Sequence, residues 1–113
     1  MPETNEDLAL DRLIHEPARL AILTVLSSTK AADFVFLQRV TGLSKGNLSS
    51  HLSKLEEGGL ITIEKSFVHK KPNTSAALTA EGRTRVAHHW EQLERLKNLS
   101  VESADSLDLD EDL

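Results

Sequence analysis

The fold is decided by residues 41–60, which read TGLSKGNLSSHLSKLEEGGL. Gly42 can adopt the left-handed conformation that ends a helix, and Ser44 can cap the helix that follows. Leu48, Leu52 and Leu55 then recur at i, i+4 and i+7, the spacing of one apolar helix face. We therefore expect a helix, a tight turn and a second helix from about Lys45 to Glu57.

The opposite face of this second helix is small and polar. It carries Gly46, Ser49, Ser50 and Ser53, and Lys45, Asn47 and Lys54 stand on its flanks. Hydroxyl, amide and ammonium groups above a leucine underside are suited to contact with a polar surface. This helix is therefore the first candidate for a binding element.

The segments on either side complete a small domain. Helices are expected over residues 8–15, 17–28 and 33–41, the last with Phe34, Leu37 and Val40 facing inward. After Gly58-Gly59 the period changes to that of a strand, Leu60 to Phe67, in which Ile61, Ile63 and Phe67 alternate and Lys65 breaks the alternation. A basic loop, HKKPN at residues 69–73, leads to a short return strand over about residues 74–78. Thr79 then caps a final helix that runs from residue 80 to about residue 99.

The expected fold class is therefore mainly α with a small β-hairpin, a winged helix-turn-helix with a long C-terminal helix. Residues 1–7 are expected to be flexible and residues 8–100 to form the domain. Residues 101–113 are expected to be an acidic, disordered tail.

Composition narrows the possible functions. The 113-residue chain contains no cysteine, which excludes disulfides and thiolate metal sites and fits a cytoplasmic protein. No apolar run approaches the roughly 18 residues of a spanning helix, and the acidic N-terminus does not resemble a secretory signal. The net charge is −5, but six acids and no base lie in residues 101–113, whereas residues 30–75 hold seven Lys/Arg and four Asp/Glu. A segment with an excess of positive charge attracts the phosphate backbone of a nucleic acid even when the net charge of the whole chain is negative.

The order of these segments resembles the winged-helix regulators of the MarR and ArsR type, in particular small MarR-like DNA-binding proteins. The residues that carry the resemblance are IHEPARLAIL (14–23), GLSKGNLSSHL (42–52), LEEGGLI (55–61), KKPNT (70–74) and LTAEGR (78–83). The resemblance implies a homodimer that binds a pseudo-palindromic operator, usually as a repressor. Wings of this family often carry an arginine after the proline, whereas this chain has Asn73, which leaves the two wing lysines to contact phosphate.

We accordingly expect binding to double-stranded DNA, with the recognition helix in the major groove and the wing on the backbone. The DNA-binding residues are expected to be Ser44, Lys45, Asn47, Ser49, Ser50, Ser53, Lys54, His69, Lys70 and Lys71. Lys45 and Asn47 are the residues best suited to base contacts, because they lie in the N-terminal half of the helix.

A homodimer is expected to form through the first and last helices. Its contact residues are expected to be Leu10, Leu13, Ile14, Val86, Trp90, Leu93 and Leu96, because the last helix carries a stripe of large apolar side chains at near-heptad spacing. Packing of this stripe within its own subunit is the alternative.

Other functions fit the sequence less well. A winged-helix module that binds proteins and no DNA would favour an acidic or apolar recognition face. An enzyme is disfavoured because no catalytic constellation or phosphate-binding loop is present. No cofactor or metal is expected, since adjacent His88 and His89 lie about 100° apart on a helix. A small-molecule effector would most simply bind between the DNA-binding core and the dimer helix, and the acidic tail could compete with DNA for the basic face.

Overall fold

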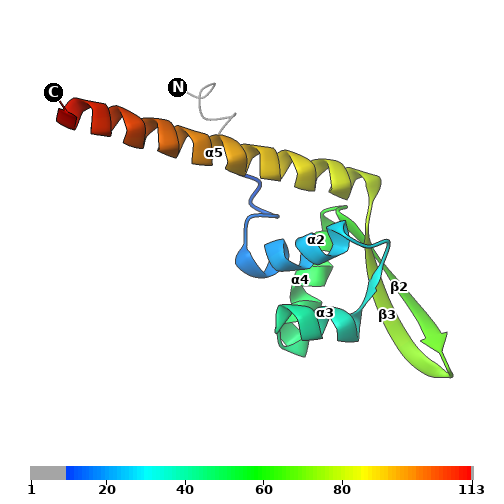
Figure 1. Ribbon diagram of the computed structural model, residues 1–113. Helices are drawn as coiled ribbons and strands as arrows, with labels where there is room; N and C mark the ends of the chain where they lie inside the picture. The colour runs from blue at the N-terminus through cyan, green and yellow to red at the C-terminus, as the bar shows by residue number, and fades with distance from the viewer. Residues whose placement is uncertain (1–9, 113) are drawn as a thin grey trace. The chain divides into compact units, whose positions relative to one another are not determined.

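The computed structural model describes residues 10–112, with side chains described for residues 10–99 (Figure 1). The chain divides into two compact units, one formed by Asp11–Val86 and a second that includes Ala87–Leu113. The elements in order are α2 (Pro17–Ser27), β1 (Ala32–Asp33), α3 (Phe34–Thr41), α4 (Lys45–Glu57), β2 (Ile61–Val68), β3 (Lys71–Leu78) and α5 (Ala80–Asp112). The predicted fold class, helices with a small antiparallel hairpin and a long last helix, is confirmed.

The turn between α3 and α4 forms as the sequence predicts. Gly42 ends α3 in the left-handed conformation, with φ of 75°, and its N–H donates to the carbonyl oxygen of Gln38 at 2.9 Å. Ser44 caps α4, since its Oγ accepts the N–H of Asn47 at 3.2 Å. Leu43, between the two caps, packs against the core. The helix-turn-helix is thus fixed by local hydrogen bonds and one apolar anchor.

The sheet has three antiparallel strands in the order β1-β3-β2. β2 pairs with β3 along its whole length, from Ile61 opposite Leu78 to Val68 opposite Lys71. β1 pairs with β3 only through Ala32 and Asp33, opposite Ala76 and Ser75. The outer half of the hairpin therefore extends beyond the helices as a two-stranded wing (Figure 1).

The core of Asp11–Val86 lies where α2, α3, α4, the inner half of the sheet and the first turns of α5 meet. Its buried residues are Ile14, Ile22, Leu23, Leu26, Ala32, Leu37, Leu48, Leu52, Leu55, Leu60, Ile61, Ala76, Leu78 and Val86. The three leucines of α4 are among them, as the helical spacing predicts. Their burial turns the polar side of α4 outward.

Thr79 fixes the start of α5. Its Oγ1 accepts the N–H of Gly82 at 2.8 Å and donates to the carbonyl oxygen of Gly59 at 2.7 Å, so the predicted cap is confirmed. A Cβ at Gly82 would lie 2.0 Å from the carbonyl oxygen of Leu60. Glycine at this position thus permits α5 to pack closely on the residue that precedes β2.

The predicted helix over residues 8–15 is wrong for its described part. Residues 12–14 form only a turn, in which the N–H groups of Ile14 and His15 donate to the carbonyl oxygen of Asp11. Glu16 is extended, with φ of −145°, because it caps α2 immediately before Pro17. An extended residue at position 16 interrupts any helix that would otherwise continue from the preceding residues into α2. Residues 8 and 9, and the predicted flexible residues 1–7, lie outside the described residues.

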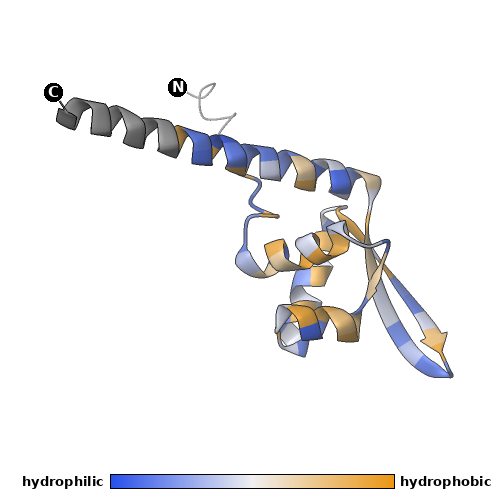
Figure 2. Cartoon of the chain, in the orientation of Figure 1, coloured by the Kyte–Doolittle hydropathy of each residue, from blue (hydrophilic) through white to orange (hydrophobic). Residues whose placement is uncertain are grey.

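Val40, which was expected to face inward, is exposed instead, and Phe67 is exposed at the end of β2 beyond the break that Lys65 makes in the alternation. Val40 is 51% exposed and Phe67 is 76% exposed. Val40 lies in the last turn of α3, and Phe67 lies on the part of the hairpin that extends beyond the core. Figure 2 shows this apolar end of β2 in orange beside hydrophilic neighbours. Helical or strand spacing alone does not show where the core ends.

The last helix is longer than the sequence predicted. α5 continues to Asp112, whereas residues 101–113 were expected to have no structure. The segment contains neither glycine nor proline, so nothing in it ends a helix that has already started. No helix in the described part of the chain has an apolar run long enough to cross a membrane.

Candidate nucleic-acid interface

The outer face of α4 presents a continuous row of exposed polar residues. The exposed members are Ser44, Lys45, Gly46, Asn47, Ser49, Ser50, Ser53 and Lys54. Leu48 and Leu52 lie beneath this row and are buried. The structure therefore brings seven of the predicted DNA-binding residues together on one surface.

α4 is also tied to α2 at the edge of this surface. Nδ1 of His51 lies 3.2 Å from a terminal nitrogen of Arg19 and 3.5 Å from a carboxylate oxygen of Glu16. A guanidinium can only donate, so in this contact Arg19 is the donor and the ring nitrogen of His51 is the acceptor. Arg19 in turn donates through Nε to the carbonyl oxygen of Leu13. This cluster holds the middle of α4 at a fixed position on the domain.

The carboxylate of Glu16 also caps α2. It accepts the N–H groups of Ala18 at 3.1 Å and Arg19 at 3.0 Å. Burial by itself would raise the pKa of Glu16. The two backbone hydrogen bonds, with the electrostatic interactions of His51 and Arg19, outweigh burial and lower that pKa below its ordinary value.

The wing differs from the predicted five-residue loop. Val68 pairs with Lys71, so the hairpin turn contains only His69 and Lys70. Both have positive φ, 52° and 67°, as a two-residue type I′ turn requires. Lys71 is the first residue of β3, and Pro72 and Asn73 follow within the strand. The three predicted basic residues therefore lie together at the tip, although only two of them are in the turn.

Proline is tolerated in β3 because of its position. The pair that closes a two-residue hairpin is hydrogen-bonded, so the next pair, Phe67 and Pro72, is of the type without such bonds. β1 pairs with β3 only at residues 75 and 76, so no strand lies on the other side of Pro72. The missing N–H of Pro72 therefore costs no ladder hydrogen bond.

The lysines of this surface are available to a ligand. Ion pairs among the side chains of residues 10–99 involve Arg85, His51 and His88, and none involves a lysine. Lys45 and Lys54 on α4, and Lys70 and Lys71 on the wing, are all exposed. Their charges are therefore not neutralised by neighbouring carboxylates, which favours a polyanionic ligand.

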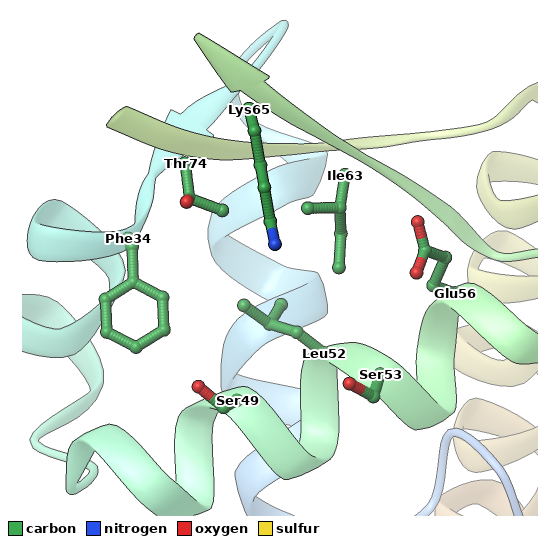
Figure 3. Close-up of a pocket in the computed structure, with 8 residues that line it drawn as sticks. All are labelled: Phe34, Ser49, Leu52, Ser53, Glu56, Ile63, Lys65 and Thr74. Atoms are coloured by element: carbon green, nitrogen blue, oxygen red, sulfur yellow. The ribbon is translucent and has the colours of Figure 1, made fainter. Parts of the chain in front are cut away.

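A groove that the sequence analysis did not assign lies between α4 and the hairpin (Figure 3). Its volume is about 550 Å³. Lys65 of β2 extends into it, opposite Ser49 and Ser53 of α4. The break that Lys65 makes in the alternation of β2 was the sequence signal for this position.

Two of the residues predicted for a dimer contact are buried within the unit Asp11–Val86. Ile14 and Val86 are 0% and 4% exposed and belong to the core of Asp11–Val86, so their predicted role at a dimer contact is corrected to one in the subunit's own packing. Leu13 also packs against this core. Trp90 is 44% exposed, and Leu10, Leu93 and Leu96 are half-buried.

A helix-turn-helix with an exposed polar second helix and a basic hairpin defines a winged helix-turn-helix domain. Comparison with known proteins gives the same class. A family described as "Winged helix DNA-binding domain" matches residues 18–97. The chain belongs to this family.

Individual proteins extend the comparison. The uncharacterized protein MJ0432 of Methanocaldococcus jannaschii is 30% identical over 89 residues, which cover 78% of this chain and 97% of that protein. A transcriptional regulator homologue from Pyrococcus horikoshii OT3 has a similar structure, with a TM-score of 0.76 and 28% identity over 87% of this chain and 96% of that chain. Staphylococcus aureus MarR shares the fold, with a TM-score of 0.61 and 21% identity over 73% of this chain and 54% of that chain. The protein thus belongs to a winged-helix DNA-binding family and shares its fold with a MarR regulator.

Proposed function

We propose that the protein is a homodimeric repressor that reads a pseudo-palindromic operator in double-stranded DNA. The observation that carries this proposal is the row of exposed side chains on α4. These side chains bear ammonium, amide and hydroxyl groups, and the leucines on the opposite face of the helix are buried. The major groove of B-DNA admits one such helix, and side chains near its N-terminus reach the base edges.

The residues of α4 have different roles in this proposal. Asn47 can make a bidentate contact with adenine, and Lys45 can donate to the acceptors of guanine. Serine hydroxyls bond to bases or phosphates with little discrimination, so Ser49, Ser50 and Ser53 contribute mainly to position. The wing residues His69, Lys70 and Lys71 lie at the end of a projecting hairpin, where they would contact the phosphate backbone.

A single recognition helix gives limited specificity, since each good bidentate contact contributes about 1–3 kcal/mol of discrimination. A two-fold dimer doubles the number of contacts. Trp90 is 44% exposed on α5, and Leu93, about one turn further along the same face, is half-buried; these neighbouring apolar side chains support pairing with a second copy. Such a dimer would place half-sites about one helical turn of DNA apart.

The repressor role follows the resemblance to MarR and ArsR regulators. A dimer that covers its operator prevents polymerase from using the same DNA. A small-molecule effector would change the spacing of the two recognition helices and so the fit to the operator.

Selection of bound DNA from fragments of the source genome tests the proposal. The full chain is expected to enrich fragments that share an inverted repeat, with centres separated by about 10 base pairs or a multiple of this spacing. Enrichment of single, unrepeated sites would contradict the dimeric operator. Absence of any enrichment by folded protein would contradict DNA recognition itself.

A further inference from the structure

The groove between α4 and the hairpin is lined by both apolar and polar side chains (Figure 3). Phe34, Leu52 and Ile63 form its apolar part. Its polar groups are the hydroxyls of Ser49, Ser53 and Thr74, the ammonium of Lys65 and the carboxylate of Glu56. Three elements therefore direct hydrogen-bonding groups into one open space beside the row of exposed residues on α4.

Lys65 is placed where the strand pattern predicts an apolar residue. It continues the alternation of Ile61 and Ile63, so its side chain leaves β2 on the side of the sheet that faces α4. Figure 3 shows the aliphatic stem crossing the groove, with the ammonium group directed toward α4. Within the part of the chain whose side chains are described, this ammonium takes part in no ion pair, although Glu56 lines the same groove.

We infer that this groove is a binding site for one phosphodiester group of the DNA backbone, with Lys65 as the cation that holds it. The inference rests on the proposed function and adds to it a contact between recognition helix and wing. With α4 in the major groove and the wing on the backbone, the intervening strand of DNA passes over the space between them. An ammonium with nearby hydroxyls is a suitable donor set for phosphate oxygens.

Glu56 makes the two ends of the groove electrostatically different. Its carboxylate lies at one end of the groove in Figure 3, and Ser49, Thr74 and Phe34 lie toward the other end. A phosphate would avoid the carboxylate and bind between Lys65 and the hydroxyls of Ser49 and Thr74. The groove would therefore fix the register of α4 along the DNA backbone without reading any base.

Lys65→Ala is the direct test, with Lys30→Ala as the matched control. Both lysines are exposed, but Lys30 lies between α2 and β1, outside the groove. With a duplex that the wild-type protein binds, Lys65→Ala is expected to weaken binding about tenfold per half-site, the effect of about one hydrogen bond to a charged group. The slope of log affinity against log salt should become shallower by about 0.9 per half-site, or about 1.8 for a dimer that loses one phosphate contact in each protomer. Lys30→Ala should change neither quantity, and Lys65→Arg should retain the wild-type slope.

Glu56→Gln gives an effect of the opposite sign. Loss of the carboxylate should strengthen DNA binding about two- to threefold, because a like charge leaves the neighbourhood of the phosphate. Glu57→Gln makes the same change in net charge at the next position of α4, which does not line the groove. Equal effects of Glu56→Gln and Glu57→Gln would contradict a phosphate in the groove.

The contact can also be located with the DNA altered and the protein intact. Single uncharged methylphosphonates are placed in turn along the bound duplex. One position per half-site should weaken the wild-type protein and have no further effect on Lys65→Ala. If wild type and Lys65→Ala respond alike at every position, the inference fails while DNA binding stands. If wild-type protein binds no duplex, the proposed function fails and this inference fails with it.

Discussion

Arg85 forms an ion pair with Asp11, which lies 74 residues earlier in the sequence. Nε and a terminal nitrogen of Arg85 donate to the same carboxylate oxygen of Asp11 at 3.1 and 2.9 Å. The other terminal nitrogen donates to the carbonyl oxygen of Gly58 at 3.3 Å. One half-buried guanidinium thus connects the segment before α2, the end of α4 and the first turns of α5.

A double-mutant cycle measures this connection. Asp11→Ala and Arg85→Ala should each destabilise the protein, and their coupling energy should be about 1 kcal/mol, at the upper end for a partly exposed ion pair. The free energy of unfolding from urea denaturation gives the value. A coupling energy of zero would mean that the pair contributes nothing beyond its two separate side chains.

The cap at Glu16 makes stability depend on pH. The pKa of Glu16 is lowered in the folded protein, so its contribution is present above the unfolded pKa and is lost as the pH falls toward the folded value. Glu16→Gln should lower the free energy of unfolding by about 1 kcal/mol at pH 7, as loss of a helix cap does. The difference from wild type should shrink as the pH falls below the ordinary pKa of a glutamate, about 4.3. Glu57→Gln, which removes an exposed carboxylate outside this cap, is the control, and a difference that does not change with pH would contradict the linkage.

The turn of the wing combines conformational strain with charge. Lys70 has φ of 67°, a conformation that costs a non-glycine residue roughly 1–2 kcal/mol. Lys70→Gly should therefore raise the free energy of unfolding by about 1 kcal/mol and, because a cation is lost, weaken DNA binding. Lys71→Ala, in the first position of β3, should weaken binding without the gain in stability. Denaturation measures the change in stability, and fluorescence anisotropy measures the change in DNA affinity. An unchanged affinity in both variants would mean that the wing does not contact DNA.

The proposed dimer depends on the apolar side chains of α5. Trp90→Asp should produce monomers in sedimentation velocity, because burial of a carboxylate at an apolar contact is unfavourable. His88→Asp introduces the same charge at an exposed position on the same helix and should leave the dimer intact. A dimer that persists in Trp90→Asp would place the contact elsewhere.

Local signals in the sequence were sufficient for the centre of the fold. The spacing of Leu48, Leu52 and Leu55 predicts α4 and its buried face, and the caps at Gly42, Ser44 and Thr79 form as expected. These features depend on residues within one or two turns of each other. The exposed row of α4 follows from them without any knowledge of the tertiary structure.

Features that depend on distant residues were not predictable. β1 has two residues, too few to show an alternation, and exists because β3 lies beside it. The turn at His69 and Lys70 lacks the Asn-Gly signature of its type, so its short length was not evident. The groove at Lys65 needs both α4 and the hairpin in place. The role of Ile14 in the core likewise follows from packing of the turn that precedes α2.

Binding selection from random duplexes with the wild-type chain and Asn47→Ala tests the central claim most directly. The wild-type protein should enrich a motif with two-fold symmetry, and Asn47→Ala should lose the preference at one position in each half-site, by about 1–3 kcal/mol, while still binding the remainder. A wild-type protein that is folded and dimeric, yet enriches no duplex at low salt, would contradict recognition of DNA by α4.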